Sequence, residues 1–374
     1  MNTALRVKTT PFPDNPTTAV EAIDALLAYA VDCGASDIHL DPRTADIIVR
    51  LRVDGIMEMA GTLPKRLHDE LIARLKILAG ARTDIHAVPQ DGRWRTELIK
   101  DAHNVRASFM PTYYGENAVL RLLPEKPAEH ISFARLGFTP DHVRLIASAL
   151  DATSGLILVT GPTGSGKTTT LSACLSIKAK EPLSVMTLED PVEYEIAGVR
   201  QVHIRHSAGV TFATGLRSAL RQDPDVIMVG EIRDAETAHV AVHTALTGHL
   251  VLSTLHTNSA IEAIPRLLDM GVDHYLLAAT LKLVVAQRLA RSICHSCLDG
   301  CEKCRWSGYI GRTIVAEVCE VGPDLKDAIA RKSSSKDLLE QARLNGFRTM
   351  DEDGAEKMAW GVTTEEEIIR VMHA

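Results

Sequence analysis

Residues 155–173 read GLILVTGPTGSGKTTTLSA and carry the clearest structural signal in the chain. The apolar run LILV at 156–159 has the length of a buried strand. A G-x4-G-K-T pattern follows it from Gly161 to Thr168, and a helix-forming stretch comes next. A glycine-rich turn could match this pattern by chance, but strand, loop and helix occur here in the order that a phosphate-binding loop requires. The sequence therefore predicts such a loop beside a parallel sheet.

The residue types in this loop predict ATP or GTP as its ligand. Backbone N–H groups of the glycine-rich segment and the N-terminus of the following helix favour phosphate oxygens. Lys167 would contact the β and γ phosphates, and the Thr168 hydroxyl would bind Mg²⁺. The predicted nucleotide-binding residues are Gly161, Pro162, Thr163, Gly164, Ser165, Gly166, Lys167, Thr168 and Thr169.

Three further apolar runs follow the loop and predict the remainder of a parallel sheet covered on both faces. They read SVMTLED at 184–190, DVIMVGE at 225–231 and HLVLSTLH at 249–256. Two of them end in carboxylates, Glu189 and Glu231, which should lie at the same edge as the loop. Either end could instead be a solvated acidic loop, but beside a phosphate loop we interpret both as functional.

Glu231 occupies the position of a Walker B acid, after four apolar residues. Gly230 stands where many P-loop enzymes carry aspartate, so Glu231 would reach Mg²⁺ either directly or through a water molecule.

Residues 17–123 predict a small α+β domain. Thr18 and Glu21 have capping-box spacing, and Asp54-Gly55 predicts a tight hairpin turn after the strand 47–53. Residues 1–16 read as a flexible tail and 124–132 as a linker. The apolar face of the first helix is expected at Val20, Ile23, Leu26, Leu27 and Ala30. A second helix is expected at 67–80, strands at 105–110 and 118–123, and C-terminal helices at 335–345, 351–360 and 364–373.

Four cysteines lie close together in the pattern Cys294-x2-Cys297-x3-Cys301-x2-Cys304. Four thiolates are the number that a structural zinc site uses. Three residues between the two pairs leave little chain to surround one ion, so an iron–sulfur cluster and a metal-free remnant stay open as alternatives. The other three of the seven cysteines, Cys33, Cys174 and Cys319, are isolated in the sequence and are expected to be buried apolar residues.

The composition of this chain of 374 residues excludes several classes of protein. Its 45% hydrophobic and 24% charged residues are globular values, and its net charge of −7 disfavours non-specific nucleic-acid binding. The longest apolar stretch, Leu276–Leu289, contains charged residues and is too short for a bilayer span. The first residues lack the apolar region of a signal peptide, so a cytoplasmic location is expected.

Four ordered motifs resemble the Walker A, Asp-box, Walker B and His-box motifs of the type II secretion and type IV pilus assembly ATPases. They are GPTGSGKTTT, TLEDPVEYEI, LRQDPDVIMVGEIRDAETA and TGHLVLSTLHTNSA, and ASDIHLDP, RLRVDG, PQDGR, VRASFMPT and GENAVLRLL are similar to the family's N-terminal domain. The resemblance implies an α/β protein with a PAS-like domain at 17–123 and a RecA-like P-loop ATPase domain at 133–374. The latter would include the tetracysteine element at 294–304 and C-terminal helices at 322–374.

The same resemblance implies catalytic roles for particular residues. Glu189 would position or deprotonate the attacking water, Glu231 would be the Walker B acid, and His256 would sense the γ-phosphate. A histidine beside an apolar strand can also be a packed structural residue. Arginines of the N-terminal domain would neutralise the transferring phosphoryl group, although each could instead pair with local carboxylates. The candidates are Arg93, Arg106 and Arg121.

The function implied is that of a homo-hexameric ATP hydrolase that powers assembly of a type IV pilus or a type II secretion pseudopilus. It would act on an inner-membrane platform protein and lie at the inner membrane through its partners, and the resemblance also implies a cytoplasmic adaptor as a partner. No specific nucleic-acid partner is expected. Absence of an AIRNLIRE-type segment favours extension over retraction, and the family's first N-terminal domain is lacking, so recruitment should differ. Alternatives are a conjugative DNA or protein traffic ATPase and a nucleotide-responsive scaffold with negligible turnover.

Overall fold

The computed structural model describes residues 16–96, 103–124, 132–193, 195–297 and 300–373. The chain forms two compact units. The first comprises residues 1–126 together with Cys294–Gly311, and the second comprises residues 127–293 and 312–374. Most of the expected tail and linker lies outside the described residues. The boundaries expected from the sequence stay a prediction, while the α/β fold class is confirmed.

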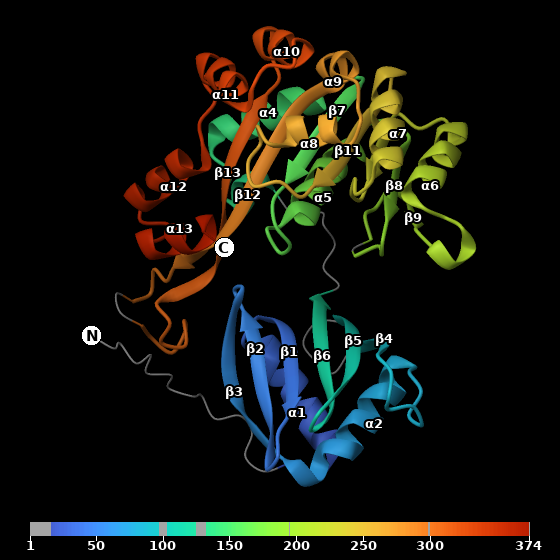
Figure 1. Cartoon of the computed structure of the whole chain (residues 1–374). Helices are drawn as coiled ribbons and strands as arrows, with labels where there is room; N and C mark the ends of the chain where they lie inside the picture. Colours follow the sequence, from blue (N-terminus) through green and yellow to red (C-terminus); the bar gives the residue numbers. More distant parts are fainter. Residues whose placement is uncertain (1–15, 97–102, 125–131, 194, 298–299, 374) are drawn as a thin grey trace. The chain divides into compact units, whose positions relative to one another are not determined.

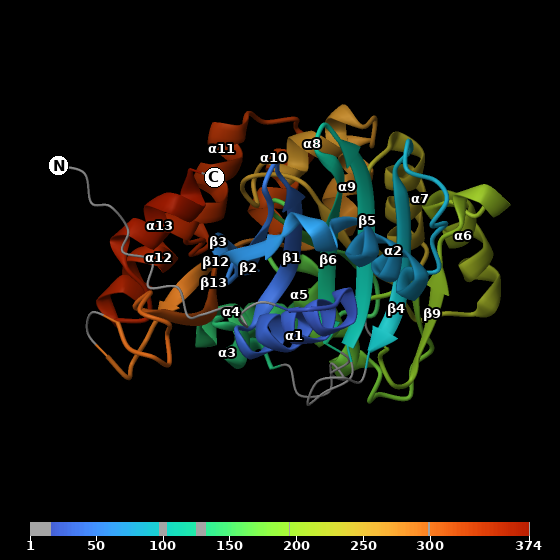
Figure 2. The same cartoon turned by 90° about the horizontal axis from the view of Figure 1, so that it is seen from below.

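The first unit contains a six-stranded sheet in the order β3-β2-β1-β6-β5-β4, and Figure 2 shows the strands in this sequence. Neighbouring strands run antiparallel. One face carries two helices whose apolar residues share a core with the sheet. The elements are α1 (Ala19–Asp32), β1 (Ala35–Pro42), β2 (Asp46–Val53), β3 (Ile56–Pro64), α2 (His68–Ala79), β4 (Gln90–Thr96), β5 (His103–Thr112) and β6 (Gly115–Pro124).

Local sequence accounts for much of this unit. The predicted capping box forms at the start of α1, where the Thr18 and Glu21 side chains each accept a backbone hydrogen bond. Asp54 and Gly55 have φ angles of 46° and 85°, which the tight turn between β2 and β3 requires. Val20 was expected in the apolar face of α1 but is 47% exposed, because the neighbouring alanines of that turn face the core instead. Strands β1 and β4 were not expected, since their sequences are largely polar.

The second unit contains most of a seven-stranded sheet in the order β13-β12-β7-β11-β10-β8-β9. The strand before the glycine-rich loop, β7, lies between β11 and β12 and runs parallel to both. The predicted parallel strands are therefore confirmed. The strands are β7 (Gly155–Thr160), β8 (Val185–Glu189), β9 (Val199–His203), β10 (Val226–Val229), β11 (Leu250–Leu255), β12 (Leu281–Ile293) and β13 (Tyr309–Glu320).

Helices cover both faces of this sheet (Figure 1). Alternate residues of β7 enter different cores: Leu156 and Leu158 pack with α7, whereas Ile157 and Val159 pack with α5. The helices are α3 (Phe133–Leu136), α4 (Pro140–Leu150), α5 (Lys167–Lys178), α6 (Phe212–Ala219), α7 (Ala235–Leu246), α8 (Ala263–Asp269), α9 (His274–Thr280), α10 (Pro323–Ala330), α11 (Ser335–Leu344), α12 (Met350–Ala359) and α13 (Glu365–Met372).

A buried carboxylate attaches the last helix to the sheet. Glu367 of α13 is 1% exposed and accepts hydrogen bonds from the backbone N–H of Arg291 on β12 (3.0 Å) and from its guanidinium (2.7 Å). Desolvation raises the pKa of Glu367, but hydrogen bonds from Arg370 and Arg291 outweigh it and lower the pKa to about 2.

Among the described residues, no helix is long and apolar enough to cross a membrane.

Candidate functional site

The glycine-rich loop connects β7 to α5 and has the backbone expected of a phosphate cradle. Gly161 and Gly166 have φ angles of 144° and 88°, and Gly166 is the N-cap of α5. Larger residues would not fit at Gly161, because a Cβ there would lie 2.5 Å from the backbone oxygen of Gln287. The Ser165 hydroxyl is buried and has no hydrogen-bond partner among the described residues, so the loop contains a polar atom that a ligand could satisfy.

Lys167 folds back onto this loop. Its Nζ donates hydrogen bonds to the carbonyl oxygens of Gly161 (2.8 Å) and Pro162 (2.9 Å). Burial of the ammonium lowers the pKa of Lys167 to about 8; the nearby Glu231 carboxylate raises it, and the Arg288 guanidinium lowers it further. Carbonyl oxygens compensate the ammonium charge only partly, so a bound anion would stabilise the charged form. Thr168 and Thr169 follow in the first turn of α5, where both are half-buried.

Glu231 and His256 lie together at the carboxyl edge of this sheet. Glu231 follows β10 and His256 follows β11, and these neighbouring strands run parallel. Glu231 Oε1 is 2.6 Å from an Arg233 guanidinium nitrogen, and its Oε2 is 3.4 Å from His256 Nε2. The His256 side chain is 48% exposed, so it is not a packed core residue.

Glu189 ends β8, the strand on the other side of β10. It is only 7% exposed, and its Oε1 accepts hydrogen bonds from Thr187 Oγ1 (2.6 Å) and Gln201 Nε2 (2.9 Å). These contacts fix the carboxylate in one orientation. Both acids therefore lie at strand ends on the edge where the loop begins, as the apolar strand pattern indicated.

The three candidate arginines lie in one row across the sheet of the first unit. Arg93 on β4 is paired with Arg106 on β5, which is paired with Arg121 on β6. Residues directly opposite each other on neighbouring strands project from the same face. Arg121 is in turn opposite Asp37 of β1, and its Nε donates to Asp37 Oδ1 at 3.0 Å. The sequence did not reveal this alignment, because it depends on strand register.

Sequence reasoning missed Gln287 of β12, which contacts the loop directly. Its side chain is fully buried and donates a hydrogen bond to the Ser165 carbonyl. A polar residue inside the apolar run LVVAQRLA was the available signal.

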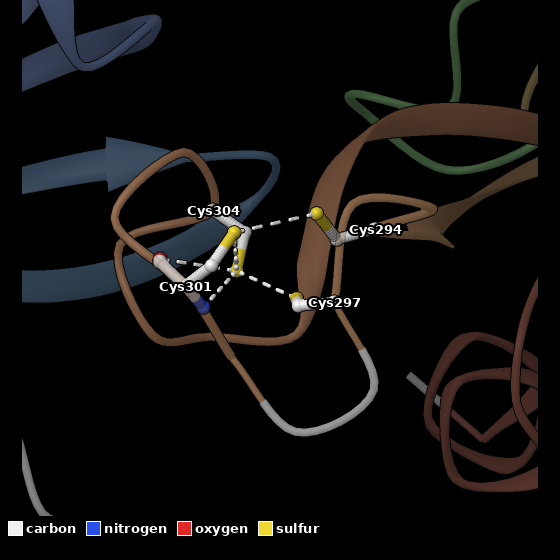
Figure 3. A group of neighbouring side chains, drawn as sticks. All are labelled: Cys294, Cys297, Cys301 and Cys304. Carbon is white, nitrogen blue, oxygen red and sulfur yellow. Dashed lines mark hydrogen bonds between the residues drawn. The ribbon is translucent and has the colours of Figure 1, made fainter.

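The four clustered cysteines converge on a common point, as Figure 3 shows. Their sulfur atoms all lie within 4.8 Å of one another. The separations Cys294–Cys301, Cys297–Cys304 and Cys301–Cys304 are 3.9, 3.5 and 3.7 Å. A tetrahedron of sulfurs at 2.3 Å from zinc has edges of about 3.8 Å. The short spacing that left a metal-free remnant open therefore still permits a set of four ligands with zinc dimensions.

Backbone hydrogen bonds favour a thiolate in this cluster. Desolvation raises the pKa of Cys304, but backbone hydrogen bonds of Cys301 and Gly308 act in the opposite direction, and the pKa is lowered to about 6. The N–H of Cys301 donates to Cys304 Sγ at 3.1 Å. Desolvation, and then hydrogen bonds with the other three cysteines, raise the pKa of Cys297 to about 12. The fit of this donor set to zinc therefore rests on the number of its sulfur atoms and on the distances between them.

Two of the three isolated cysteines are buried. Burial raises the pKa of Cys174 and of Cys319 to about 12, and both are buried, as predicted. Cys33 was predicted to be buried but is only half-buried, because it follows the last residue of α1, where the helix ends.

The tetracysteine segment is attached to the β2–β3 hairpin within the first unit. The Gly311 N–H donates to Asp54 Oδ2 at 2.9 Å, and the Arg305 guanidinium lies 3.3 Å from Glu58 Oε2. The contact between Asp54 and Gly311 joins residues that are 257 positions apart in the sequence.

The sequence is similar to known secretion proteins along nearly its whole length. A family model described as type II/IV secretion system protein matches residues 14–370. Type II secretion system protein HxcR of Pseudomonas aeruginosa is 43% identical over 361 residues, covering 94% of this chain and 77% of that protein. The type IV pilus assembly ATPase PilB of Thermus thermophilus is 41% identical over 363 residues, covering 90% of this chain and 41% of that protein.

Two solved structures are similar to this fold. The Legionella pneumophila ATPase DotB has a TM-score of 0.76 at 23% identity, over 96% of this chain and 97% of that chain. The pilus retraction motor PilT, solved with bound ADP, has a TM-score of 0.67 at 28% identity, over 93% and 96% of the two chains.

Proposed function

Since the chain belongs to the family of type II secretion and type IV pilus assembly ATPases, we propose that it hydrolyses ATP as a hexamer and thereby powers filament assembly. The observation that carries this proposal is the glycine-rich loop, in which a partly desolvated Lys167 is held by carbonyl oxygens. Such an ammonium lacks a full counter-charge, and a triphosphate would supply one.

Phosphate oxygens would replace the carbonyls of Gly161 and Pro162 as partners of Lys167. The N–H groups at the start of α5 would add to this attraction, because the N-terminus of a helix carries partial positive charge. The Thr168 hydroxyl and Glu231 would hold Mg²⁺, either directly or through water. The metal would neutralise charge on the β and γ phosphates.

We assign the attacking water to Glu189. The hydrogen bonds from Thr187 and Gln201 both fall on Oε1, so Oε2 is the oxygen that we assign to the water. A fixed carboxylate can orient the water and accept its proton without first reorganising. His256, in contact with Glu231, would sense the γ-phosphate through the same carboxylate.

The arginine row would supply positive charge to the transition state. Arg93, Arg106 and Arg121 project from one face of one sheet, so they could approach an anion together. We propose that they contact the γ-phosphate of their own chain or of a neighbouring chain in the ring. Guanidinium groups suit this role because their planar donors match phosphoryl oxygens.

We further propose that the ring acts at the cytoplasmic side of the inner membrane on a platform protein, with a cytoplasmic adaptor as a further partner. The similarity to a type II secretion protein and to a pilus assembly ATPase supports assembly of a pilus or pseudopilus. The tetracysteine element would bind one structural zinc ion through Cys294, Cys297, Cys301 and Cys304.

The catalytic assignment is tested by comparing nucleotide binding with phosphate release in five variants. Lys167→Ala should lose both activities, whereas Glu189→Gln and Glu231→Gln should bind ATP and lose at least about 100-fold in kcat. Lys180→Ala changes an exposed residue in the turn after α5, and Glu340→Gln changes an exposed residue of α11; both serve as matched controls. Unchanged phosphate release in Lys167→Ala and Glu189→Gln would refute the proposal. Stimulation of hydrolysis by DNA would instead favour conjugative traffic, and binding without turnover would favour a scaffold.

A further inference from the structure

Gln287 is a buried amide within an otherwise apolar part of β12. Its side chain is 0% exposed, and the preceding residues Val284, Val285 and Ala286 all belong to the hydrophobic cores. Ala286 is paired with Thr160, the last residue of β7. Gln287, the next residue of β12, therefore lies beside the junction between β7 and the loop. Burying an amide costs free energy unless its polar atoms are hydrogen-bonded.

Both ends of this amide are hydrogen-bonded to the nucleotide site. Nε2 donates to the Ser165 carbonyl oxygen at 2.7 Å, and Oε1 accepts from Thr170 Oγ1 at 2.8 Å. Thr170 is itself buried in the first turns of α5. Gln287 therefore joins the glycine-rich loop to the helix that follows it.

The loop backbone also fits closely against this residue. A Cβ at Gly161 would lie 2.5 Å from the Gln287 backbone oxygen, and one at Gly166 would lie 3.1 Å from its Nε2. The glycines at the two ends of the loop thus allow it to close onto one residue of the neighbouring strand.

The hydrogen bond to Ser165 fixes the direction of a peptide group. In a planar trans peptide the C=O and N–H bonds point in opposite directions. With the Ser165 carbonyl directed at Gln287, the Gly166 N–H is directed away from β12. A backbone N–H held in this way is the element from which phosphate cradles are built.

We propose that Gln287 is a positioning residue that holds the glycine-rich loop in its phosphate-binding conformation. This inference rests on the proposed nucleotide binding and adds a residue from outside the loop. Without the amide, the Ser165–Gly166 peptide can rotate, and the bound nucleotide loses a prearranged donor. We expect nucleotide affinity to fall at least about tenfold, because a single hydrogen bond to a charged group has an effect of this order.

The test compares Gln287→Met with Val285→Ala. Methionine keeps the length of the side chain and removes both hydrogen bonds, whereas Val285 lies on the same strand, is buried in the core that includes α5, and makes no side-chain hydrogen bond to the loop among the described contacts. Gln287→Met should raise the Kd for ADP and the KM for ATP at least about tenfold and change kcat less than about threefold. Val285→Ala should lower Tm and leave Kd and KM within about twofold.

A second pair of variants keeps the test decisive if Gln287→Met does not fold. Thr170→Val removes the hydroxyl that Gln287 accepts from, and Thr170→Ser retains it. Valine should weaken ADP binding, and serine should restore it.

The possible outcomes are distinguishable. If wild-type protein binds no nucleotide, the proposed function and this inference both fail. If it binds ADP, but Gln287→Met and Thr170→Val bind ADP as tightly as wild type, Gln287 is only a packing residue and the inference alone is overturned.

Discussion

Nucleotide binding should weaken as the pH rises through 8, because Lys167 would lose the proton that its phosphate contacts require. The pKa of this lysine in the ligand-free protein is lowered to about 8, first by burial and then by the Arg288 charge, with Glu231 opposing both. Phosphate would stabilise the ammonium and raise its pKa again in the complex. Binding above pH 8 must therefore be accompanied by proton uptake.

The size of the effect follows from this pKa. The charged fraction of a group with a pKa of about 8 falls from about 0.76 at pH 7.5 to about 0.03 at pH 9.5. If only the ammonium form binds, the Kd for ADP rises about 25-fold over this interval. A lysine with the ordinary pKa of about 10.5 would produce a change of only about 1.1-fold.

Isothermal titration with ADP measures both quantities. Kd is determined between pH 7.5 and 9.5, above the range in which the nucleotide phosphates titrate, and buffers of different ionisation enthalpy report about 0.9 proton taken up at pH 9. Lys167→Arg is the matched control, since a guanidinium remains charged throughout. A change in Kd below about twofold, or the same slope in Lys167→Arg, would refute the reasoning.

The stability of the ligand-free protein should change with pH in the opposite direction to nucleotide affinity. Between about pH 8 and 10.5 the unfolded chain would bind more protons at this lysine than the folded, ligand-free protein does. Lys167 therefore makes a contribution to the free energy of unfolding that increases as the pH rises through this window.

Further predictions concern other parts of the molecule. Cys301→Ser should reduce zinc content, measured by elemental analysis, from about one ion per chain towards zero and should lower Tm, whereas wild-type protein without zinc would contradict the assignment. Glu367→Gln should lower the free energy of unfolding by about 3 kcal/mol in chemical denaturation, because it weakens a buried ion pair with Arg291. In wild type, the contribution of Glu367 to the free energy of unfolding is fully present above pH 4.5 and should be lost as the pH falls through about 2. If Glu367→Gln loses stability in acid to the same extent as wild type, Glu367 is not the source of that pH dependence. Arg106→Ala should reduce kcat at least about tenfold, and Arg95→Ala on the same sheet should not; equal effects would indicate only a general charge contribution.

Much of the second unit could be predicted because its signals are local. Strand, glycine-rich loop and helix are contiguous around Gly161–Thr168. The strands of a buried parallel sheet can be recognised from their own apolar sequence, without knowledge of the strands that they pair with. The hairpin at Asp54-Gly55 was equally clear, since two residues determine the turn. The roles assigned to Glu189, Glu231 and His256 stay predictions, although the strand ends on which they lie were correctly expected.

Features that depend on distant partners were not predictable. Gln287 acts on a loop more than 100 residues earlier, and its hydrogen bond to Ser165 spans 122 residues. The alignment of Arg93 with Arg106 depends on strand register. The exposure of Val20 depended on which side of α1 met the sheet, a choice that helical spacing alone left undecided.

The attachment of the tetracysteine segment to the β2–β3 hairpin affects how this protein can be divided. Residues 294–311 are encoded late in the chain but belong to the unit formed by its beginning. Deleting residues 1–126 would leave the cysteines in the chain but would remove Asp54 and Glu58, the hairpin residues that contact Gly311 and Arg305. A protease cut between residues 126 and 132 should leave two fragments that still copurify. Expression of residues 127–374 alone would therefore yield a polypeptide in which the segment 294–311 lacks the rest of the unit to which it belongs.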